Sequence, residues 1–310
     1  MVLYFKERRL YIYFGGTKLW KKTEAKAQMF VLMAALLWGT TGSAQAFAPP
    51  DATPIVIGAL RMAIGGTALL LVARVRGAFK TKIKVNKKLL LIASLCMAAY
   101  QPLFFLGVFK TGIALGTVLA LGSAPVFSGI IEYFMGGKLS KKWIVATIIS
   151  IVGCTFLFAG QETINMNIFG SILSLGAGLS YALYVRASQR LFKNSRRDVV
   201  NGLVFFISGV ILSPILFMND LSWVTTTRGI MVTLHLGIIA TALAYSLFAY
   251  GLVNISTPKA VTLTLVEPLT AAILGVVLFN EKLRGISVVG ILLLFCGLII
   301  NSYPGKHKAK

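Results

Sequence analysis

The sequence predicts an all-α integral membrane protein of ten transmembrane helices, built from two inverted five-helix repeats around a central cavity. Three observations lead to this fold class. Hydrophobic residues make up 57% of the 310 residues and charged residues only 13%, against roughly 45–50% and about 25% in soluble proteins. Apolar runs of about 18–23 residues, long enough to cross a bilayer, recur along the chain. Finally, the two halves of the chain resemble each other.

Ten segments are long enough to cross about 30 Å of hydrocarbon. In order, they are Ala27–Ala48, Pro54–Arg74, Leu89–Phe109, Gly112–Phe134, Trp143–Gly160, Ile168–Val185, Val199–Met218, Gly229–Tyr250, Thr257–Phe279 and Ser287–Ser302. The apolar run from Leu89 to Phe134 is too long for one span, so it must turn. The polar break available for that turn is Lys110–Thr111–Gly112.

The positions of lysine and arginine predict how the spans are oriented. Of these 31 residues, 26 fall in the two terminal tails or the even-numbered connectors, and four fall on the opposite side. The remaining one, Arg61, lies within a span. Because cytoplasmic connectors retain basic residues, both termini are expected in the cytoplasm. The net charge of +22 therefore reflects membrane topology, and no nucleic-acid partner is expected.

Four segments follow from this topology. Residues 1–26 are expected to form a basic cytoplasmic tail, residues 27–160 the first five-helix repeat, residues 161–303 the second, and residues 304–310 a second basic tail. The first tail does not have the cleavage site of a signal peptide. Within it, Leu3–Phe14 fits either a basic, aromatic helix on the membrane surface or a disordered tail.

Matching residues recur in the two halves at a nearly constant shift of 143 or 144 positions. The pairs are Ala34 with Ala177, Leu36 with Leu179, Trp38 with Tyr181, Phe104 with Phe248, Gly107 with Gly251, Pro125 with Pro268, and Gly153 with Gly297. Because five spans is an odd number, the second copy must enter the membrane from the opposite side. Inverted repeats are a recurring plan of secondary transporters, since the pair has two nearly equivalent arrangements. The repeat thus predicts transport by alternating access.

Several motifs resemble those of the EamA-like transporters, a family within the drug/metabolite transporter superfamily. They are LLWG at Leu36–Gly39, LR at Leu60–Arg61, GSAP at Gly122–Pro125, and LVEPLTAAILGVVLFNEKL from Leu265 to Leu283, followed by Gly290 and Gly297. The resemblance covers about Ala27–Tyr303. One position departs from it, since Lys138 stands where the repeat would place the acidic partner of Glu281.

The resemblance implies a carrier in the plasma membrane of a bacterium or archaeon, with ten helices around a central cavity. It also implies substrates such as amino acids, other small metabolites or toxic compounds, and export is the commoner direction in the family. No cofactor or metal is expected, and a proton is a candidate coupling ion.

Two ionisable residues lie deep inside predicted spans, where a charge at a helix centre costs roughly 2.5–3.5 kcal/mol on an insertion scale. At a rise of 1.5 Å per residue, Arg61 lies about 10 Å from the start of its span, and Glu267 lies about 15 Å from the start of its own span. Both are expected to meet in one cavity. Arg61 would bind a substrate carboxylate through its planar fork of donors, and Glu267 would bind an amine or carry a proton. A structural ion pair that never touches substrate would satisfy the same desolvation cost.

Aromatic and polar residues near the same depth complete the expected substrate site. Trp38 and Tyr181 occupy equivalent repeat positions away from the membrane interfaces, where they could stack on substrate or gate the cavity; core packing is the alternative. Tyr100, Gln101 and Tyr245 add hydrogen-bonding capacity.

Pro125 and Pro268 stand at corresponding positions of two spans. Each removes a backbone donor and frees a carbonyl one turn earlier. Interrupted helices at matching positions indicate a binding site, although a simple packing kink is equally compatible with the sequence. His235 is a further candidate for proton coupling.

Other classes of protein fit the sequence less well. The chain has no H-E-x-x-H, G-x-S-x-G or glycine-rich phosphate loop, so an enzyme is not expected. A channel needs a selectivity ring, usually from several subunits, and a scaffold would not explain Arg61 and Glu267. A facilitative pore and a non-transporting scaffold remain the alternatives to a carrier.

Overall fold

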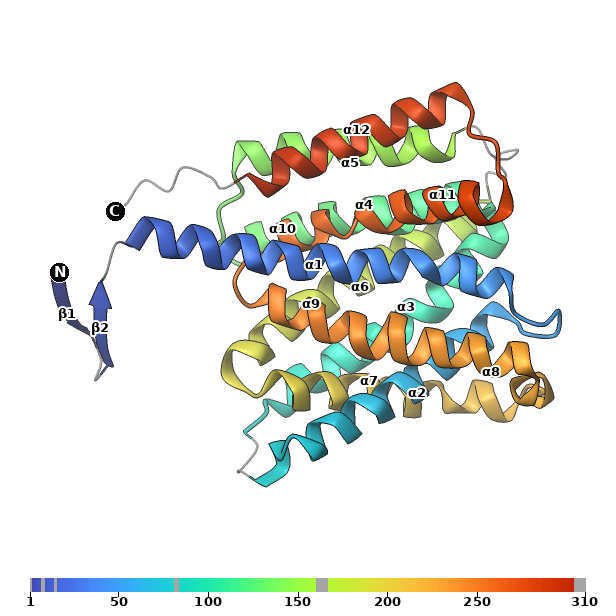
Figure 1. Cartoon of the computed structure of the whole chain (residues 1–310), viewed down its shortest axis with the longest axis horizontal. Coiled ribbons are helices and arrows are strands. Elements are labelled where there is room, and N and C mark those ends of the chain that lie inside the picture. The colour runs from blue at the N-terminus through green and yellow to red at the C-terminus, as the bar shows by residue number, and fades with distance from the viewer. Residues whose placement is uncertain (1, 7–8, 14–15, 81–83, 160–166, 304–310) are drawn as a thin grey trace.

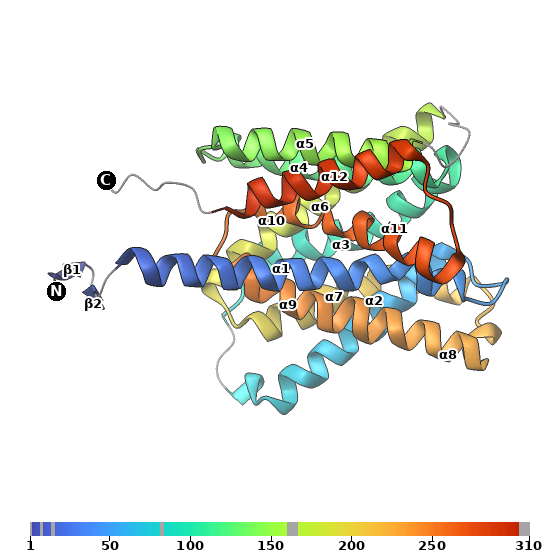
Figure 2. The ribbon, with the colours of Figure 1, turned by 45° about the horizontal axis from the view of Figure 1, so that its top comes forward.

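The computed structural model describes residues 2–6, 9–13, 16–80, 84–159 and 167–303, and for the residues before 23 it describes the backbone alone. Within this part of the chain, ten helical segments are long and apolar enough to cross a membrane. They lie side by side in one bundle along its long axis (Figures 1 and 2). The expected all-α membrane fold is therefore confirmed.

The helices follow the order of the predicted spans. The first half contributes α1 (Gly16–Ala46), α2 (Pro54–Val75), the short helix η1 (Ala78–Lys80), α3 (Lys87–Thr111), α4 (Ile113–Phe134) and α5 (Lys141–Phe158). The second half contributes α6 (Ile168–Asn194), α7 (Arg197–Phe217), η2 (Ser222–Thr225), α8 (Thr227–Leu234), η3 (His235–Leu243), α9 (Ala244–Leu252), α10 (Thr257–Leu263), α11 (Val266–Phe279) and α12 (Gly285–Ser302). Together α8, η3 and α9 form the eighth span, and α10 with α11 forms the ninth.

Local sequence determines where several helices begin. Side chains of Asn86, Ser140 and Asn167 accept hydrogen bonds from backbone amides three residues later, which is the usual way to satisfy the free donors of a helix start. The turn between α3 and α4 occurs at Gly112, whose φ of 86° favours glycine. This is the polar break that the length of the apolar run required.

The amino-terminal segment differs from both expectations for it. Val2–Lys6 (β1) and Arg9–Tyr13 (β2) pair as antiparallel strands, so Leu3–Phe14 is not a surface helix, and residues 7, 8 and 14 lie outside the described part. The first helix also begins at Gly16, well before the membrane-length segment Thr23–Ala46. The backbone hydrogen bonds of this segment are therefore made between two strands, a pairing that the sequence analysis did not predict.

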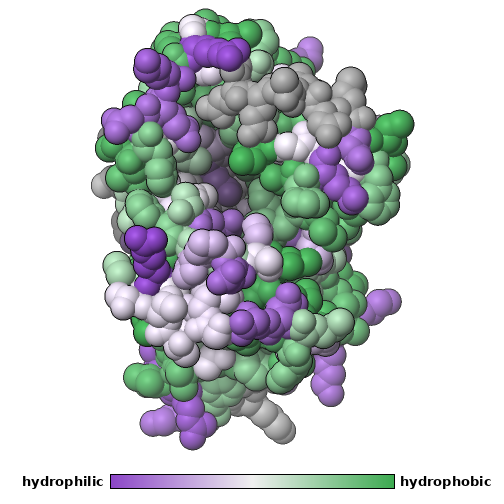
Figure 3. Space-filling model, turned by 90° about the vertical axis from the view of Figure 1, so that its right-hand side faces the viewer, coloured by the Kyte–Doolittle hydropathy of each residue, from purple (hydrophilic) through white to green (hydrophobic). Residues whose placement is uncertain are grey.

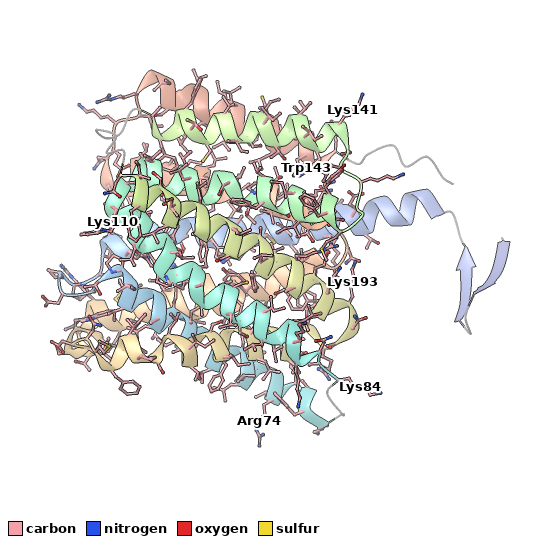
Figure 4. All side chains as sticks on the ribbon, turned by 180° about the vertical axis from the view of Figure 1, so that it is seen from behind. Arg74, Lys84, Lys110, Lys141, Trp143 and Lys193 are labelled. Atoms are coloured by element: carbon pink, nitrogen blue, oxygen red, sulfur yellow. The ribbon has the colours of Figure 1, made fainter. Side chains whose placement is uncertain are left out.

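The bundle has an apolar perimeter and two ends of different charge. Large apolar side chains such as Phe109 (84% exposed) and Phe217 (89% exposed) face outward, as lipid contact requires. We call the end at which α1 begins and α12 ends the tail end. Lys84, Lys141 and Lys193 lie at this end, and Lys110 lies at the other (Figure 4), in line with the predicted sidedness.

The main helix contacts join the two halves of the chain. The helix α2 packs on α7, α5 on α12, α3 on α6, and α4 on α6, while α1 packs on both α9 and α11. Glycines permit a close crossing of α5 and α12, since a Cβ atom at Gly153 of α5 would lie 2.8 Å from the carbonyl oxygen of Gly290 in α12. The halves therefore share one core.

Candidate functional site

A small polar cavity of about 30 Å³ lies in the middle of the bundle. Its lining residues come from both halves: Trp38, Thr41, Arg61, Tyr100, Leu121, Ala124, Tyr181, Tyr245, Thr264 and Glu267. Six of the seven expected substrate-binding residues are among them. At this volume the central cavity holds about one water molecule, so a substrate requires helices to move apart. The end opposite the tail end is hollowed, with hydrophilic residues deep in the hollow (Figure 3).

Arg61 projects from α2 and is only 7% exposed. Its Nε donates to Thr241 Oγ1 at 3.1 Å and its Nη2 to the carbonyl oxygen of Ala240 at 3.3 Å. The ion pairs among the described residues are Arg186–Glu132, Arg196–Asp198 and Lys259–Glu24. In the described structure, therefore, Arg61 and Glu267 share a cavity without forming a salt bridge.

Glu267 lies beside a break in the ninth span. The helix α10 ends at Leu263, and α11 starts at Val266 with Glu267 in its first turn, where the helix dipole favours a negative charge. Pro268 follows it, at a position where its missing N–H disturbs little. No hydrogen bond or ion pair from a described residue reaches the Glu267 carboxylate.

Gly39 of the first span has a local physical reason. A Cβ atom at Gly39 would lie 2.9 Å from the carbonyl oxygen of Glu267. Glycine thus lets α1 approach the start of α11 closely. This approach places Trp38 against the cavity that Glu267 also lines.

Aromatic rings form one wall of the central cavity. The Trp38 ring lies 4.6 Å from that of Tyr245 and 6.4 Å, edge on, from that of Tyr181. Tyr100 lies 5.7 Å from Tyr181. Three buried polar atoms of the lining have no hydrogen-bond partner among the described residues: Trp38 Nε1, Thr41 Oγ1 and Tyr181 Oη. Since buried polar groups are rarely left unpaired, these atoms point to a polar ligand or water.

Some expected residues lie outside the lining. Gln101 is buried in α3, with its Nε2 3.9 Å from the sulfur atoms of Met62 and Met97. His235 begins η3, and its Nε2 lies 2.8 Å from Thr40 Oγ1. Neither is among the residues of the cavity wall.

The two prolines have different settings. Pro125 lies inside α4, which continues through it, next to the lining residue Ala124. Pro268 follows the break between α10 and α11. Only the second-half proline accompanies an interrupted span.

The sequence reasoning missed Thr41, Leu121, Ala124 and Thr264 as lining residues. Helical spacing offers a signal for two of them, because residues three apart share a face. Thr41 follows Trp38 by three positions, and Thr264 precedes Glu267 by three. Leu121 and Ala124 give no chemical signal, being small or apolar.

A second, larger cavity of about 760 Å³ opens at the tail end, and we call it the vestibule. Two ion pairs that line it each join the two halves: Lys259 Nζ to Glu24 Oε1 at 2.7 Å and Arg186 Nη1 to Glu132 Oε2 at 2.8 Å. Gln189 connects further segments, since its Nε2 donates to the carbonyl oxygens of Leu252 and Ile255. The tail ends of the helices are thus held together.

No metal-binding cluster accompanies these cavities in the described ranges: no three His, Cys, Asp or Glu side chains come close enough to hold an ion. The three cysteines are free, with Cys154 buried, Cys96 half-buried and Cys296 exposed.

Comparison with protein families gives a match over nearly the whole chain. The model of the EamA-like transporter family matches twice, at residues 25–159 and 168–303. The two matches correspond to the two halves identified from the repeated residues.

Individual relatives are also transporters by name. The chain is 43% identical over 282 residues to "Uncharacterized transporter YwfM" of Bacillus subtilis, covering 90% of this chain and 95% of that one. It is 28% identical over 280 residues to "Threonine/homoserine exporter RhtA" of Escherichia coli K12, covering 89% of each. A solved crystal structure superposes with a TM-score of 0.77 at 16% identity, covering 88% of this chain and 95% of that one; this likeness concerns the fold alone.

Proposed function

We propose that this chain, which belongs to the EamA-like transporter family, is a secondary-active exporter of amino acids or related small organic compounds. That it is a multi-pass membrane transporter follows from the family and from its relatives. The substrate, the direction and the alternating-access mechanism are the parts proposed. We place the protein in the plasma membrane with both tails in the cytoplasm, since the tail end carries most of the basic residues.

The pattern of helix packing supports alternating access. Exchanging the two halves pairs spans 1 to 5 with spans 6 to 10. Under this exchange the contacts α2–α7 and α5–α12 map onto themselves. The contact α3–α6 maps onto the contact of α1 with the eighth span, and the contact α4–α6 maps onto the contact of α1 with the ninth span. A two-fold axis in the membrane plane produces such a pattern, and inverted repeats of this kind rock between two arrangements.

The central cavity carries the proposal of a zwitterionic substrate. A guanidinium and a carboxylate line the same space without pairing with each other, together with three polar atoms that have no hydrogen-bond partner among the described residues. Arg61 would bind a carboxylate in bidentate fashion, and Glu267 would bind an ammonium group or exchange it for a proton. A 28% identical relative is named a threonine/homoserine exporter, which favours amino acids and export.

Counterflow in proteoliposomes tests the proposal. Proteoliposomes that contain the protein are loaded with one unlabelled solute, and the labelled form of the same solute is added outside. The solutes tested are threonine, homoserine, other amino acids, carboxylates, nucleosides and cationic drugs. We expect saturable counterflow with threonine or homoserine. We also expect Arg61→Ala to abolish it while expression and thermal midpoint stay at the wild-type values.

Other results would contradict the proposal in different ways. Flux that never saturates indicates a facilitative pore, and no flux with any solute indicates a scaffold. Wild-type counterflow in Arg61→Ala would remove Arg61 from the substrate site.

A further inference from the structure

The eighth span contains a π-helical stretch beside Arg61. The nine residues of η3 continue α8 into α9 without a break in the span. Such helices are rare, usually a single turn, and frequent at functional sites. The hydroxyl of Thr241 donates to the carbonyl oxygen of Leu236, five residues earlier, at 2.8 Å.

The wider helix changes the backbone pairing around the carbonyl that Arg61 contacts. In an α-helix the amide of Ala244 would donate to the carbonyl of Ala240. Here it donates to the carbonyl oxygens of Ile239 and Thr241. The Ala240 oxygen, which the amide of Ala244 does not use, accepts from Arg61 Nη2 at 3.3 Å.

Thr241 presents an acceptor to the same guanidinium. Its single hydroxyl hydrogen is used toward Leu236, so a lone pair of Oγ1 remains to accept from Arg61 Nε at 3.1 Å. A guanidinium has five N–H donors in a planar fork. The edge formed by Nε and Nη2 faces η3, and no described residue accepts from Nη1.

A glycine on α2 makes room for this contact. Gly65 follows Arg61 by four positions and so lies on the same helix face. A Cβ atom there would lie 2.8 Å from Thr241 Cβ and 2.9 Å from the carbonyl oxygen of Gly237. The close packing of α2 against η3 therefore fixes where the Thr241 side chain lies.

The repeat does not duplicate this arrangement. The shift of 143 places Val204 at the position of Arg61, and the shift of 144 places Met97 at that of Thr241. The third span, which contains Met97, is α-helical from Lys87 to Thr111. The similarity of the two halves therefore does not explain why η3 is a π-helix. Its contact with Arg61, which only the first half contains, offers an explanation.

We propose that Thr241 is a positioning residue for substrate recognition: with the Ala240 carbonyl it holds the guanidinium of Arg61 so that the Nη1–Nη2 end binds the substrate carboxylate. This inference rests on the proposed function. It assigns a role to a residue that does not itself line the central cavity.

Thr241→Val tests the inference, because it keeps the branched shape and removes the hydroxyl. We expect about tenfold weaker binding of L-threonine, the size of effect given by one lost hydrogen bond to a charged group. Binding of 1-amino-2-propanol, the same molecule without its carboxylate, should not change. Thr241→Ser should restore the affinity for L-threonine. Binding to detergent-purified full-length protein is measured by calorimetry.

Thr233→Val is the matched control. Thr233 is buried in the same span, and its hydroxyl donates only along its own helix, to the carbonyl oxygens of Gly229 and Ile230. Both affinities should remain at the wild-type values. An equal loss of affinity for both ligands in Thr241→Val would indicate a structural role and overturn the inference. An unchanged affinity for L-threonine would also overturn it.

The failure of the proposed function gives a different result. If the wild-type protein binds neither compound, the amino-acid assignment is wrong, and the inference falls with it. If the wild type prefers L-threonine and Thr241→Val keeps that preference, only the inference is wrong.

Discussion

Arg61 and Glu267 are held in different ways although both line the central cavity. Backbone and hydroxyl oxygens of η3 accept from Arg61, which offsets part of the cost of burying its charge. Glu267 instead lies in the first turn of α11, near the positive end of a helix dipole. Neither residue therefore needs an ion pair with the other to be accommodated inside the membrane. Both groups are therefore available to a ligand.

At the scale of the residue, Glu267→Gln tests proton coupling. A proton and a substrate amine compete for the same carboxylate, so the apparent affinity of the wild type should weaken as the pH falls. The glutamine variant has no group to titrate there, and we expect its flux to be independent of pH between about 5 and 8. Flux in proteoliposomes is measured at each pH.

Glu281→Gln is the control for this change, because Glu281 follows α11 and is not among the lining residues. It should keep the pH dependence of the wild type. A Glu267→Gln protein with an unchanged pH profile would move the coupling to another group, with His235 the next candidate.

At the scale of the element, the ninth span differs from its partner in the first half. Two residues, Thr264 and Leu265, separate α10 from α11, whereas α4 is continuous. The short helix α10 carries Lys259, which pairs with Glu24 of α1 at the tail end. A short segment next to a break can move with little disturbance of α11. We infer that the tail end opens by separation of α10 from α1.

Crosslinking tests this movement. Glu24→Cys and Lys259→Cys, joined by a short bifunctional thiol reagent that a reductant cleaves, should stop counterflow, and the reductant should restore it. The matched control joins Glu24→Cys to Gln28→Cys within α1, where the native side chains lie 3.4 Å apart, and should leave counterflow unchanged. Transport that persists while α1 and α10 are joined would show that they need not separate.

At the scale of the whole molecule, the sequence was sufficient for the number of spans, their order and the charged ends of the bundle. Length and hydropathy decide these features, since each span must cross the same apolar thickness. Six lining residues could also be predicted. Arg61 and Glu267 were indicated because costly groups inside a membrane face a cavity, and the four aromatic residues because they lie near the same depth. The two matches to the family model agree with the repeat read from residue pairs.

Other features depend on packing that one sequence does not reveal. The π-helix η3 has no hydropathy signature, because its residues are as apolar as those of an α-helix. Gln101 faces two methionines, and only the three-dimensional placement of α3 separates it from the central cavity. Near the amino terminus, strand pairing stands where the sequence left a surface helix and a disordered tail as alternatives, since the aromatic and basic residues there suit several conformations.

Alternating access requires that one cavity become accessible from each side of the membrane in turn, and labelling of Thr41→Cys tests this requirement. Cys96, Cys154 and Cys296 are first replaced by serine, and right-side-out and inside-out vesicles are treated with a membrane-impermeant thiol reagent. Asn219→Cys, in the exposed loop after α7, is the control and should react from one side only. We predict that Thr41→Cys reacts from both sides and that L-threonine protects it. Reaction from a single side under all conditions, without protection, would contradict alternating access through this cavity.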